Sequence, residues 1–321
     1  LQRSNSYARI SRRAMACEFT LFFPAKYPSL VEAGCAALDE IQRLESKLSV
    51  YREDSEVTYV NRHAFDGAVA VDDELFALLN KAARITQETG NAFDVAAGAL
   101  IKAWGFFRGP RRAPVESQLS AAMASSGISH VKLDAGSRTV RFLRDGLEIN
   151  LGSIGKGYAI DRALELIGKT YNARSVLMHG GQSSLKGIGA PPDEPRGWKI
   201  EIGDPYRSRA PVASVWLKNR ALGTSSAANQ WFVDRGQQYG HIVDPRTGWP
   251  AKGLASASAI ASSAADADSL STAFFVMGID ATKQYCEQHP GIGAVLVTQR
   301  KAKQQPQVIA FGIGPEEVEL H

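Results

Sequence analysis

The sequence has no long apolar run. No stretch of about 18 consecutive apolar residues occurs in its 321 residues, so no segment is predicted to span a membrane. Charge of one sign is also lacking, because 37 basic and 33 acidic residues leave a net charge of only +4. The basic residues are dispersed, which argues against a nucleic-acid partner. The opening stretch LQRSNSYARISRRAM has no apolar signal core, so no secretion signal is predicted within this chain.

Cysteine is scarce as well. Cys17, Cys35 and Cys286 are far apart and odd in number, which fits neither a disulfide framework nor a zinc site. We therefore expect mostly buried thiols. No internal repeat is evident. No Gly-x-Ser-x-Gly segment occurs either, which disfavours a Ser-His-Asp hydrolase.

Apolar residues are plentiful, at 44% of the chain, and their spacing predicts the elements. Recurrence at three and four residues predicts helices at 29–48, 73–89, 158–167 and 268–277. Short apolar or alternating runs predict strands at 20–23, 131–133, 139–142 and 293–298, within WKIEIGDP and VASVWLKN, and in a segment ending at residue 151. Hairpin strands mixed with separate helices indicate an α+β fold rather than a doubly wound parallel sheet.

The stretch NLGSIGKGYAIDRALELI, residues 150–167, places a glycine-rich turn between a predicted strand and a predicted helix. Backbone N–H groups and the helix dipole at such a turn favour an anion, and Lys156 adds a positive charge suited to phosphate. The spacing is not that of a P-loop. The alternative is an ordinary tight turn with a surface lysine.

The stretch AADADSLSTAFFVMG places Asp268 and Thr272 four residues apart, on one face of a predicted helix. A carboxylate and a hydroxyl are hard oxygen ligands that suit Mg²⁺, which keeps waters or substrate phosphates as further ligands. The alternative is that Asp268 caps the helix, a position for which Asp266 competes.

Two further stretches carry polar groups among apolar neighbours. In TGNAFDVAAGALIKAWGF, Asp94 must form hydrogen bonds with backbone or with a polar ligand, whereas Phe93, Trp104 and Phe106 are typical of a core. In QYGHIVDPRTGWPAKG, His241 is either a titrating catalytic group or part of a well-made turn.

These stretches, taken together and in this order, resemble the ApbE-like flavin transferases, the FAD:protein FMN transferase family. The resemblance covers about residues 13 to 298, and HIVDPRTG and GKGYAID are its most specific pieces. The other matching stretches are MACEF, LSVYREDSEVTYVN, TGNAFD, WGF, HGGQSS, GTSS and ADSLSTAFFVMG.

The resemblance implies an α+β fold in which mixed sheet-and-helix lobes enclose a flavin cleft. We expect residues 1–321 to form a single domain of this kind, with 1–12 and 300–321 peripheral. The implied reaction uses FAD and Mg²⁺, moves FMN onto a threonine hydroxyl of an acceptor protein and releases AMP. The implied acceptors are subunits of ion-pumping respiratory or electron-transfer complexes outside the cytoplasm. An exported, membrane-associated protein is therefore expected, with its signal or anchor outside this chain.

The resemblance also assigns roles by matching position. The implied FAD-binding residues are Met15, Tyr51, Ala92, Phe93, Asp94, Asn150, Lys156 and Ile242. The implied metal ligands are Asp268, Thr272 and the backbone carbonyl of Ser153, with Ser271 at the edge of the site. His241 is the expected general base toward the acceptor threonine, and Asp268 could share that role.

The chain departs from the family pattern at a few positions. The family more often has aspartate at Asn150, Gly-Thr at Ala16-Cys17 and glycine at Ser226. After the paired glycines it favours an acidic residue or an amide, and Gln182 carries an amide. Ser271 also stands where a second acidic residue sometimes occurs, which should weaken Mg²⁺ binding. Two other functions remain open: hydrolysis of FAD to FMN and AMP, and FAD binding without catalysis.

Overall fold

The computed structural model describes residues 7–24, 29–207, 210–227, 230–300 and 306–321. Its centre is an eight-stranded sheet in the order β1-β2-β6-β7-β10-β13-β14-β15, and every neighbouring pair is antiparallel. The strands are β1 (Tyr7–Ala14), β2 (Cys17–Pro24), β6 (Val176–Gly180), β7 (Ser184–Ile188), β10 (Arg220–Ser226), β13 (Leu254–Ala261), β14 (Gly293–Thr298) and β15 (Val308–Phe311).

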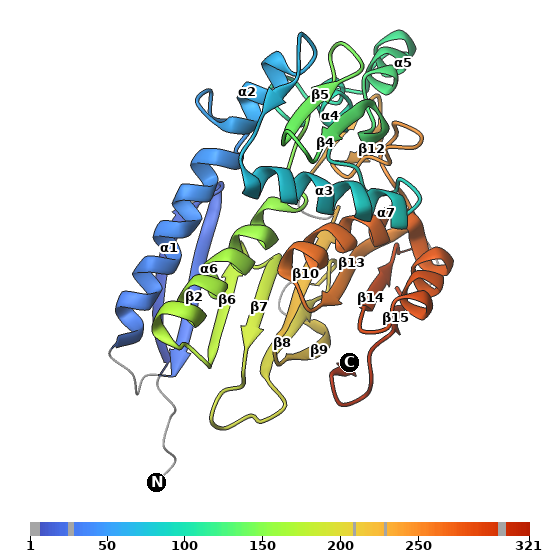
Figure 1. Cartoon of the computed structure of the whole chain (residues 1–321). Helices are drawn as coiled ribbons and strands as arrows, with labels where there is room; N and C mark the ends of the chain where they lie inside the picture. Colours follow the sequence, from blue (N-terminus) through green and yellow to red (C-terminus); the bar gives the residue numbers. More distant parts are fainter. Residues whose placement is uncertain (1–6, 25–28, 208–209, 228–229, 301–305) are drawn as a thin grey trace.

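Three long helices cover one face of this sheet (Figure 1): α1 (Ser29–Leu48), α6 (Gly155–Tyr171) and α7 (Ala264–Gln288). Their apolar stripes pack against alternate strand residues such as Phe19 and Leu21, which are fully buried. This layer forms the main hydrophobic core.

A smaller sheet covers part of the opposite face. It has the order β16-β9-β8 and consists of β8 (Trp198–Gly203), β9 (Pro211–Leu217) and β16 (Val318–Leu320). Leu185, Leu222 and Ile260 of the large sheet share a second core cluster with Trp198 and Val215 of the small one. Within the described residues, β8 is therefore an edge strand with one side unpaired.

The remaining elements form a lobe at one end of the large sheet, at the top of Figure 1. They are α2 (Glu56–His63), β3 (Val69–Ala70), α3 (Asp73–Glu88), α4 (Gly98–Ala103), α5 (Glu116–Ala124), a 3₁₀ turn (Ile128–His130), β4 (Val131–Asp134), β5 (Thr139–Phe142), β11 (Trp231–Asp234) and β12 (Gln237–Gly240). β3, β5 and β4 form one sheet, and β11 and β12 form another. No helix of the described segments is long and apolar enough to cross a membrane.

The termini contribute edge strands. β1 and β15 are the two edges of the large sheet, and β16 is an edge of the small one. Residues 1–6 and 301–305, which belong to the segments expected to be peripheral, lie outside the described residues.

The mixed α+β fold and most predicted elements are confirmed, but the strand predicted to end at residue 151 is wrong. Its backbone finds partners outside any sheet. The amide of Ile149 donates to Asn61 Oδ1 at 2.8 Å, and Asn61 Nδ2 donates back to the carbonyl of Ile149 at 2.9 Å. The amide of Asn150 donates to the carbonyl of Val95 at 2.7 Å. These contacts hold the segment extended without a ladder.

The helices predicted at 158–167 and 268–277 are longer in the structure, where they are α6 and α7. The N-cap residue of α7 is neither of the two candidates, Asp266 and Asp268. Ser263 is its N-cap and accepts a hydrogen bond from the amide of Asp266, so neither Asp266 nor Asp268 caps the helix. Asp266 instead pairs with Lys81 at 2.5 Å. Of the three thiols, only that of Cys286 is buried; Cys35 is exposed, contrary to expectation.

Candidate active site

A cavity of about 940 Å³ is lined by residues from the end of the large sheet and from the lobe. Its volume is at the upper end of the range of about 300–1,000 Å³ that is typical of ligand pockets. Most of the predicted site residues line it: Tyr51, Ala92, Phe93, Asp94, Asn150, Ser153, Lys156, His241, Ile242, Asp268 and Thr272. Residues that are widely separated in sequence therefore share one concave surface.

Two predicted residues are not among those that line the cavity. Met15 lies in the two-residue loop between β1 and β2, and its amide donates to Glu45 Oε1 at 2.7 Å. Both Met15 and Ala16 have left-handed backbone, with φ of 47° and 60°. Ser271 lies behind the cavity wall, where its hydroxyl donates to the carbonyl of Asp268 at 2.8 Å.

Asp268 is positioned by the anchored start of α7. The carboxylate of Asp161, on α6, accepts hydrogen bonds from the amides of Ala264 and Ala265, both at 2.9 Å, and from Ser263 Oγ at 2.8 Å. Lys186 Nζ lies 2.6 Å from the same carboxylate. Three of these donors belong to the first turn and cap of α7, so Asp161 fixes the start of that helix to α6.

Two glycines allow α7 to approach closely. A Cβ at Gly157 would lie 2.1 Å from the carbonyl oxygen of Ala264, and one at Gly223 would lie 2.2 Å from that of Ala267. Only a residue without Cβ fits either position unless the backbone moves. Packing against both α6 and β10 therefore sets the depth at which the Asp268 side chain sits.

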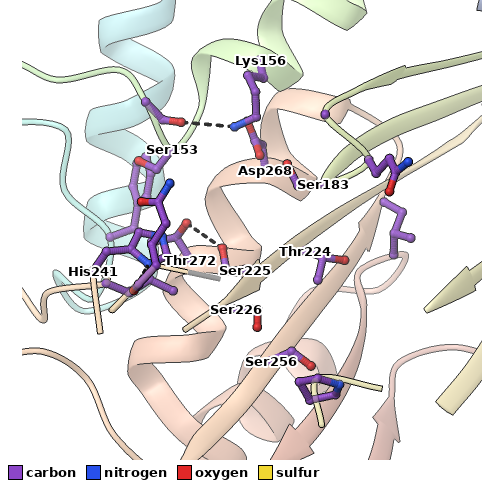
Figure 2. Close-up of a pocket in the computed structure, with 18 of the residues that line it drawn as sticks. Ser153, Lys156, Ser183, Thr224, Ser225, Ser226, His241, Ser256, Asp268 and Thr272 are labelled. Atoms are coloured by element: carbon purple, nitrogen blue, oxygen red, sulfur yellow. Dashed lines mark hydrogen bonds and ion pairs between the residues drawn. The ribbon is translucent and has the colours of Figure 1, made fainter. Parts of the chain in front are cut away.

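The Asp268 side chain is 6% exposed and is held on both oxygens. Oδ2 accepts from the amide of Gly157 at 3.1 Å, and Oδ1 accepts from Ser184 Oγ at 2.8 Å. Lys156 Nζ lies 3.9 Å from Oδ2 and 3.5 Å from the carbonyl oxygen of Gly152 (Figure 2). A buried carboxylate and an ammonium group thus meet at the glycine-rich turn that precedes α6.

Sequence reasoning missed two hydroxyl groups beside this centre. Ser184 holds Asp268 as described, and Ser225 Oγ lies 2.9 Å from Ser271 Oγ. Ser225 Oγ also lies 3.1 Å from Thr272 Oγ1 (Figure 2). Both lie in stretches that matched the flavin transferases, HGGQSS and GTSS, but a serine in a matching stretch carries no signal of its partner.

The donor set fits a hard cation that keeps non-protein ligands. Among the described residues, no group of three or more His, Cys, Asp or Glu side chains is arranged to hold a metal ion. Asp268 and Thr272 line the cavity together, and each oxygen of Asp268 keeps a lone pair after its one hydrogen bond. One carboxylate with hydroxyl and carbonyl oxygens suits Mg²⁺ and is a poor site for zinc.

His241 lies on the cavity wall with a defined tautomer. Its Nδ1 is 3.1 Å from the carbonyl oxygen of Gln230. A carbonyl can only accept, so Nδ1 carries the proton and Nε2 keeps its lone pair. Burial lowers the pKa of His241 below its ordinary value, and the nearby charges of Arg111 and Lys156 lower it further, against the opposing effect of the Gln230 carbonyl. The ring is therefore neutral at neutral pH, and its Nε2 lone pair can accept a proton.

Asp94 shapes the opposite wall through backbone contacts. Its Oδ1 accepts from the amide of Ala96 at 2.7 Å, and its Oδ2 accepts from the amide of Ile128 at 2.8 Å. Burial raises the pKa of Asp94, and the two amide bonds oppose that shift. The carboxylate ties the loop at Phe93 to the loop before β4, which leaves its remaining lone pairs for a ligand.

Aromatic rings lie at the mouth of the cavity. Tyr51 is 54% exposed and stacks on Phe107 with ring centroids 4.9 Å apart, and Arg108 donates to the carbonyl of Tyr51 at 2.8 Å. Phe93 and Trp104 are buried, as expected for a core. Phe106 is half-buried and lines the cavity, so its prediction as core holds only in part.

Comparison with known proteins gives the family of this chain. The model of the ApbE family matches residues 15–296. The chain belongs to the ApbE family. The FAD:protein FMN transferase of Treponema pallidum is 30% identical over 278 residues, which cover 82% of this chain and 77% of that protein. The FAD:protein FMN transferase of Haemophilus influenzae is 29% identical over 258 residues, covering 78% and 73%.

Solved ApbE structures share the fold. The crystal structure of the ApbE protein from Thermotoga maritima superposes with a TM-score of 0.83, at 29% identity, and covers 91% of this chain and 94% of that one. The apo form of the flavinyl transferase ApbE from Pseudomonas stutzeri gives the same TM-score at 26% identity, covering 96% and 98%.

Proposed function

We propose that this protein transfers FMN from FAD to a threonine hydroxyl of an acceptor protein and releases AMP. The observation that carries the proposal is the meeting of Lys156, Asp268, Thr272 and His241 on one cavity, in a chain of the ApbE family. The relatives named as FAD:protein FMN transferases support the transfer of FMN from FAD to a protein.

The proposed reaction is a phosphoryl transfer in which one P–O bond forms and one P–O bond breaks. The threonine oxygen bonds to the phosphorus of the FMN half, and the bond from that phosphorus to the bridging oxygen breaks. AMP leaves with the bridging oxygen, and the threonine proton goes to a base. Such chemistry depends mostly on positioning and on neutralising charge at the diphosphate.

Lys156 and the start of α6 supply positive potential for the diphosphate. The Lys156 ammonium lies at the first turn of α6, where the helix dipole also favours an anion. Its salt-bridge partner Asp268 lies 3.9 Å away, so the ammonium is held near the cavity rather than extended into solvent.

Mg²⁺ would be held by Asp268, Thr272 and the carbonyl of Ser153, with Ser271 behind them. When bound, the ion would offset negative charge on the diphosphate and on the leaving AMP. The donor chemistry of these residues supports the assignment, and Ser225 keeps the Thr272 hydroxyl in place at 3.1 Å.

His241 supplies the base. Its Nδ1–H donates a hydrogen bond to the Gln230 carbonyl, and Nε2 can accept the threonine proton. Because its pKa is lowered, the ring is in the accepting form at neutral pH before the acceptor arrives. Tyr51, Ala92, Phe93, Asp94, Asn150 and Ile242 line the same cavity and are proposed to contact FAD.

The partner is proposed to be a subunit of an ion-pumping respiratory or electron-transfer complex. The resemblance implies such acceptors outside the cytoplasm, so the protein is proposed to act there, in an exported form at the membrane.

The direct test is to incubate the protein with FAD, Mg²⁺ and an apo acceptor domain from an ion-pumping respiratory complex, and to measure the intact mass of that domain. We expect its mass to rise by that of FMN less one water, with AMP released in equal amount. AMP released together with free FMN, on an unmodified acceptor, would make the protein an FAD hydrolase. Flavin binding without AMP would leave only an FAD-binding protein.

A further inference from the structure

The cavity extends to both faces of the large sheet. Side chains alternate along β10, so Ser225 faces α7 while Thr224 and Ser226 face the small sheet. β13 follows the same rule: Ser256 pairs with Ser226, and Ser258 pairs with Thr224. All the proposed catalytic and metal-binding contacts of β10 lie on the α7 face. The other face has been given no role so far.

The part of the cavity on this second face is named the β8 arm. Its walls are the hydroxyl residues Thr224, Ser226 and Ser256 on one side and residues 200–203 of β8 on the other. In Figure 2, Ser256 lies at the end of the close-up away from Lys156, with Ser226 and Thr224 between them.

One hydroxyl in the β8 arm is buried without a partner. Ser256 is 3% exposed, and its Oγ makes no hydrogen bond among the described residues although it lines the cavity. Thr224 Oγ1, in contrast, lies 2.8 Å from Ser258 Oγ. An unsatisfied buried hydroxyl is costly in a folded protein, and a ligand in the cavity could supply the missing hydrogen-bond partner.

The opposite wall is an unpaired strand edge. Among the residues that the structure describes, β8 pairs with β9 on one side only, and four consecutive residues of β8 line the cavity. Alternate backbone N–H and C=O groups of an edge strand point away from its sheet, where an extended peptide can pair with them. A hydroxyl row facing a strand edge offers hydrogen-bonding groups suited to a peptide backbone rather than to a flat ring.

We infer that the β8 arm binds an extended segment of the acceptor protein and guides its threonine to the diphosphate. The inference rests on the proposed function, which requires a second, protein substrate to enter the cavity. The segment pairs with the free edge of β8, and Ser256 completes its hydrogen bonding with a polar group of that segment. FAD occupies the side lined by Lys156 and Asp268.

Gly203 provides a clean way to block the β8 arm. It ends β8, lines the cavity, and has open space around it, since a Cβ there would meet no heavy atom within 4 Å. Gly203→Trp should therefore fill the arm without disturbing the core. Gly168 on α6 has the same open surroundings and does not line the cavity, so Gly168→Trp is the matched control.

The experiment measures FMN transfer to the acceptor domain and, separately, FAD affinity by flavin fluorescence. Gly203→Trp should lower kcat/KM for the acceptor by about tenfold or more, with unchanged FAD affinity, whereas Gly168→Trp should match the parent. Ser256→Ala should raise the KM for the acceptor by roughly three- to tenfold, the effect of one hydrogen bond. The two substitutions alter opposite walls, so misfolding of one variant leaves the other as the test.

Three results would overturn the inference. Equal loss of FAD affinity and of transfer would assign the β8 arm to FAD. Normal transfer by both folded variants would leave the arm without a role, while the proposed function would stand. A parent protein that binds FAD but modifies no acceptor would refute the proposed function, and the inference with it.

Discussion

Two substitutions distinguish the two possible roles of His241, general base and turn residue. His241→Asn keeps a side-chain N–H at the position of Nδ1, which can still donate to the Gln230 carbonyl, but it ends before Nε2. His241→Ala removes both groups. If Nε2 accepts the threonine proton, both variants should slow transfer by about 10²–10⁴-fold, the usual contribution of a general base.

The two variants should differ in their free energy of unfolding, although both should transfer FMN slowly. The Nδ1 bond to Gln230, at 3.1 Å, is a single neutral hydrogen bond. Its loss in His241→Ala should cost about 0.5–1.5 kcal/mol of unfolding free energy, whereas His241→Asn should retain most of it. Urea denaturation measures this, and FAD affinity should change little in either variant because proton removal matters only in the transition state.

The pH profile gives an independent check. A lowered pKa means that His241 stays neutral to a pH below its ordinary value of about 6.5, and activity should fall as pH drops through that lowered pKa. The acid limb of kcat/KM in the parent should therefore lie below about pH 6.5 and should vanish in His241→Asn. Transfer by His241→Asn at the parent rate would refute the assignment and leave His241 as a turn residue.

Four further substitutions test the surroundings of the site. Gly157→Ala should destabilise the protein by about 1–3 kcal/mol, because the added Cβ would meet the Ala264 carbonyl. Gly168→Ala, in open space on the same helix, should stabilise it by about 0.5–1 kcal/mol. Thermal melting of the two variants measures the difference. Asp268→Ala should abolish Mg²⁺-dependent transfer. It leaves two buried donors without their acceptor, so the free energy of unfolding in urea should fall by about 1–3 kcal/mol. A fully active variant would show that Asp268 does not belong to the site. Ala16→Gly should raise stability by about 0.5–1 kcal/mol, since φ of 60° strains alanine but not glycine, and an unchanged melting temperature would argue against that strain.

The departure at Ala16 has a structural reading. The family pattern described above implies glycine at this position, and the backbone here is left-handed, a conformation that glycine adopts without strain. At the second departure, Asn150, the side-chain Oδ1 accepts a hydrogen bond from the amide of Gly152 at 2.9 Å. An aspartate could accept the same bond. That contact holds the glycine-rich turn in either case.

Local pattern alone determined much of this protein. The spacing of apolar residues predicted α1 at its observed bounds and α3 to within one residue, because helix periodicity is a property of neighbouring residues. The motif stretches identified the family, and most of the assigned residues line one cavity.

Tertiary structure decided what local pattern cannot encode, which is the identity of hydrogen-bond partners. The segment before Leu151 looked like a strand, but a distant asparagine and a loop took up its backbone groups. Asp268 looked free or like a cap, yet its partners Gly157 and Ser184 lie 111 and 84 positions away. The extension of the cavity to the second face of the sheet likewise depends on how two sheets pack. Contacts between residues so far apart in sequence form only when the chain folds. Neither residue of such a pair has a local sequence pattern that identifies its partner.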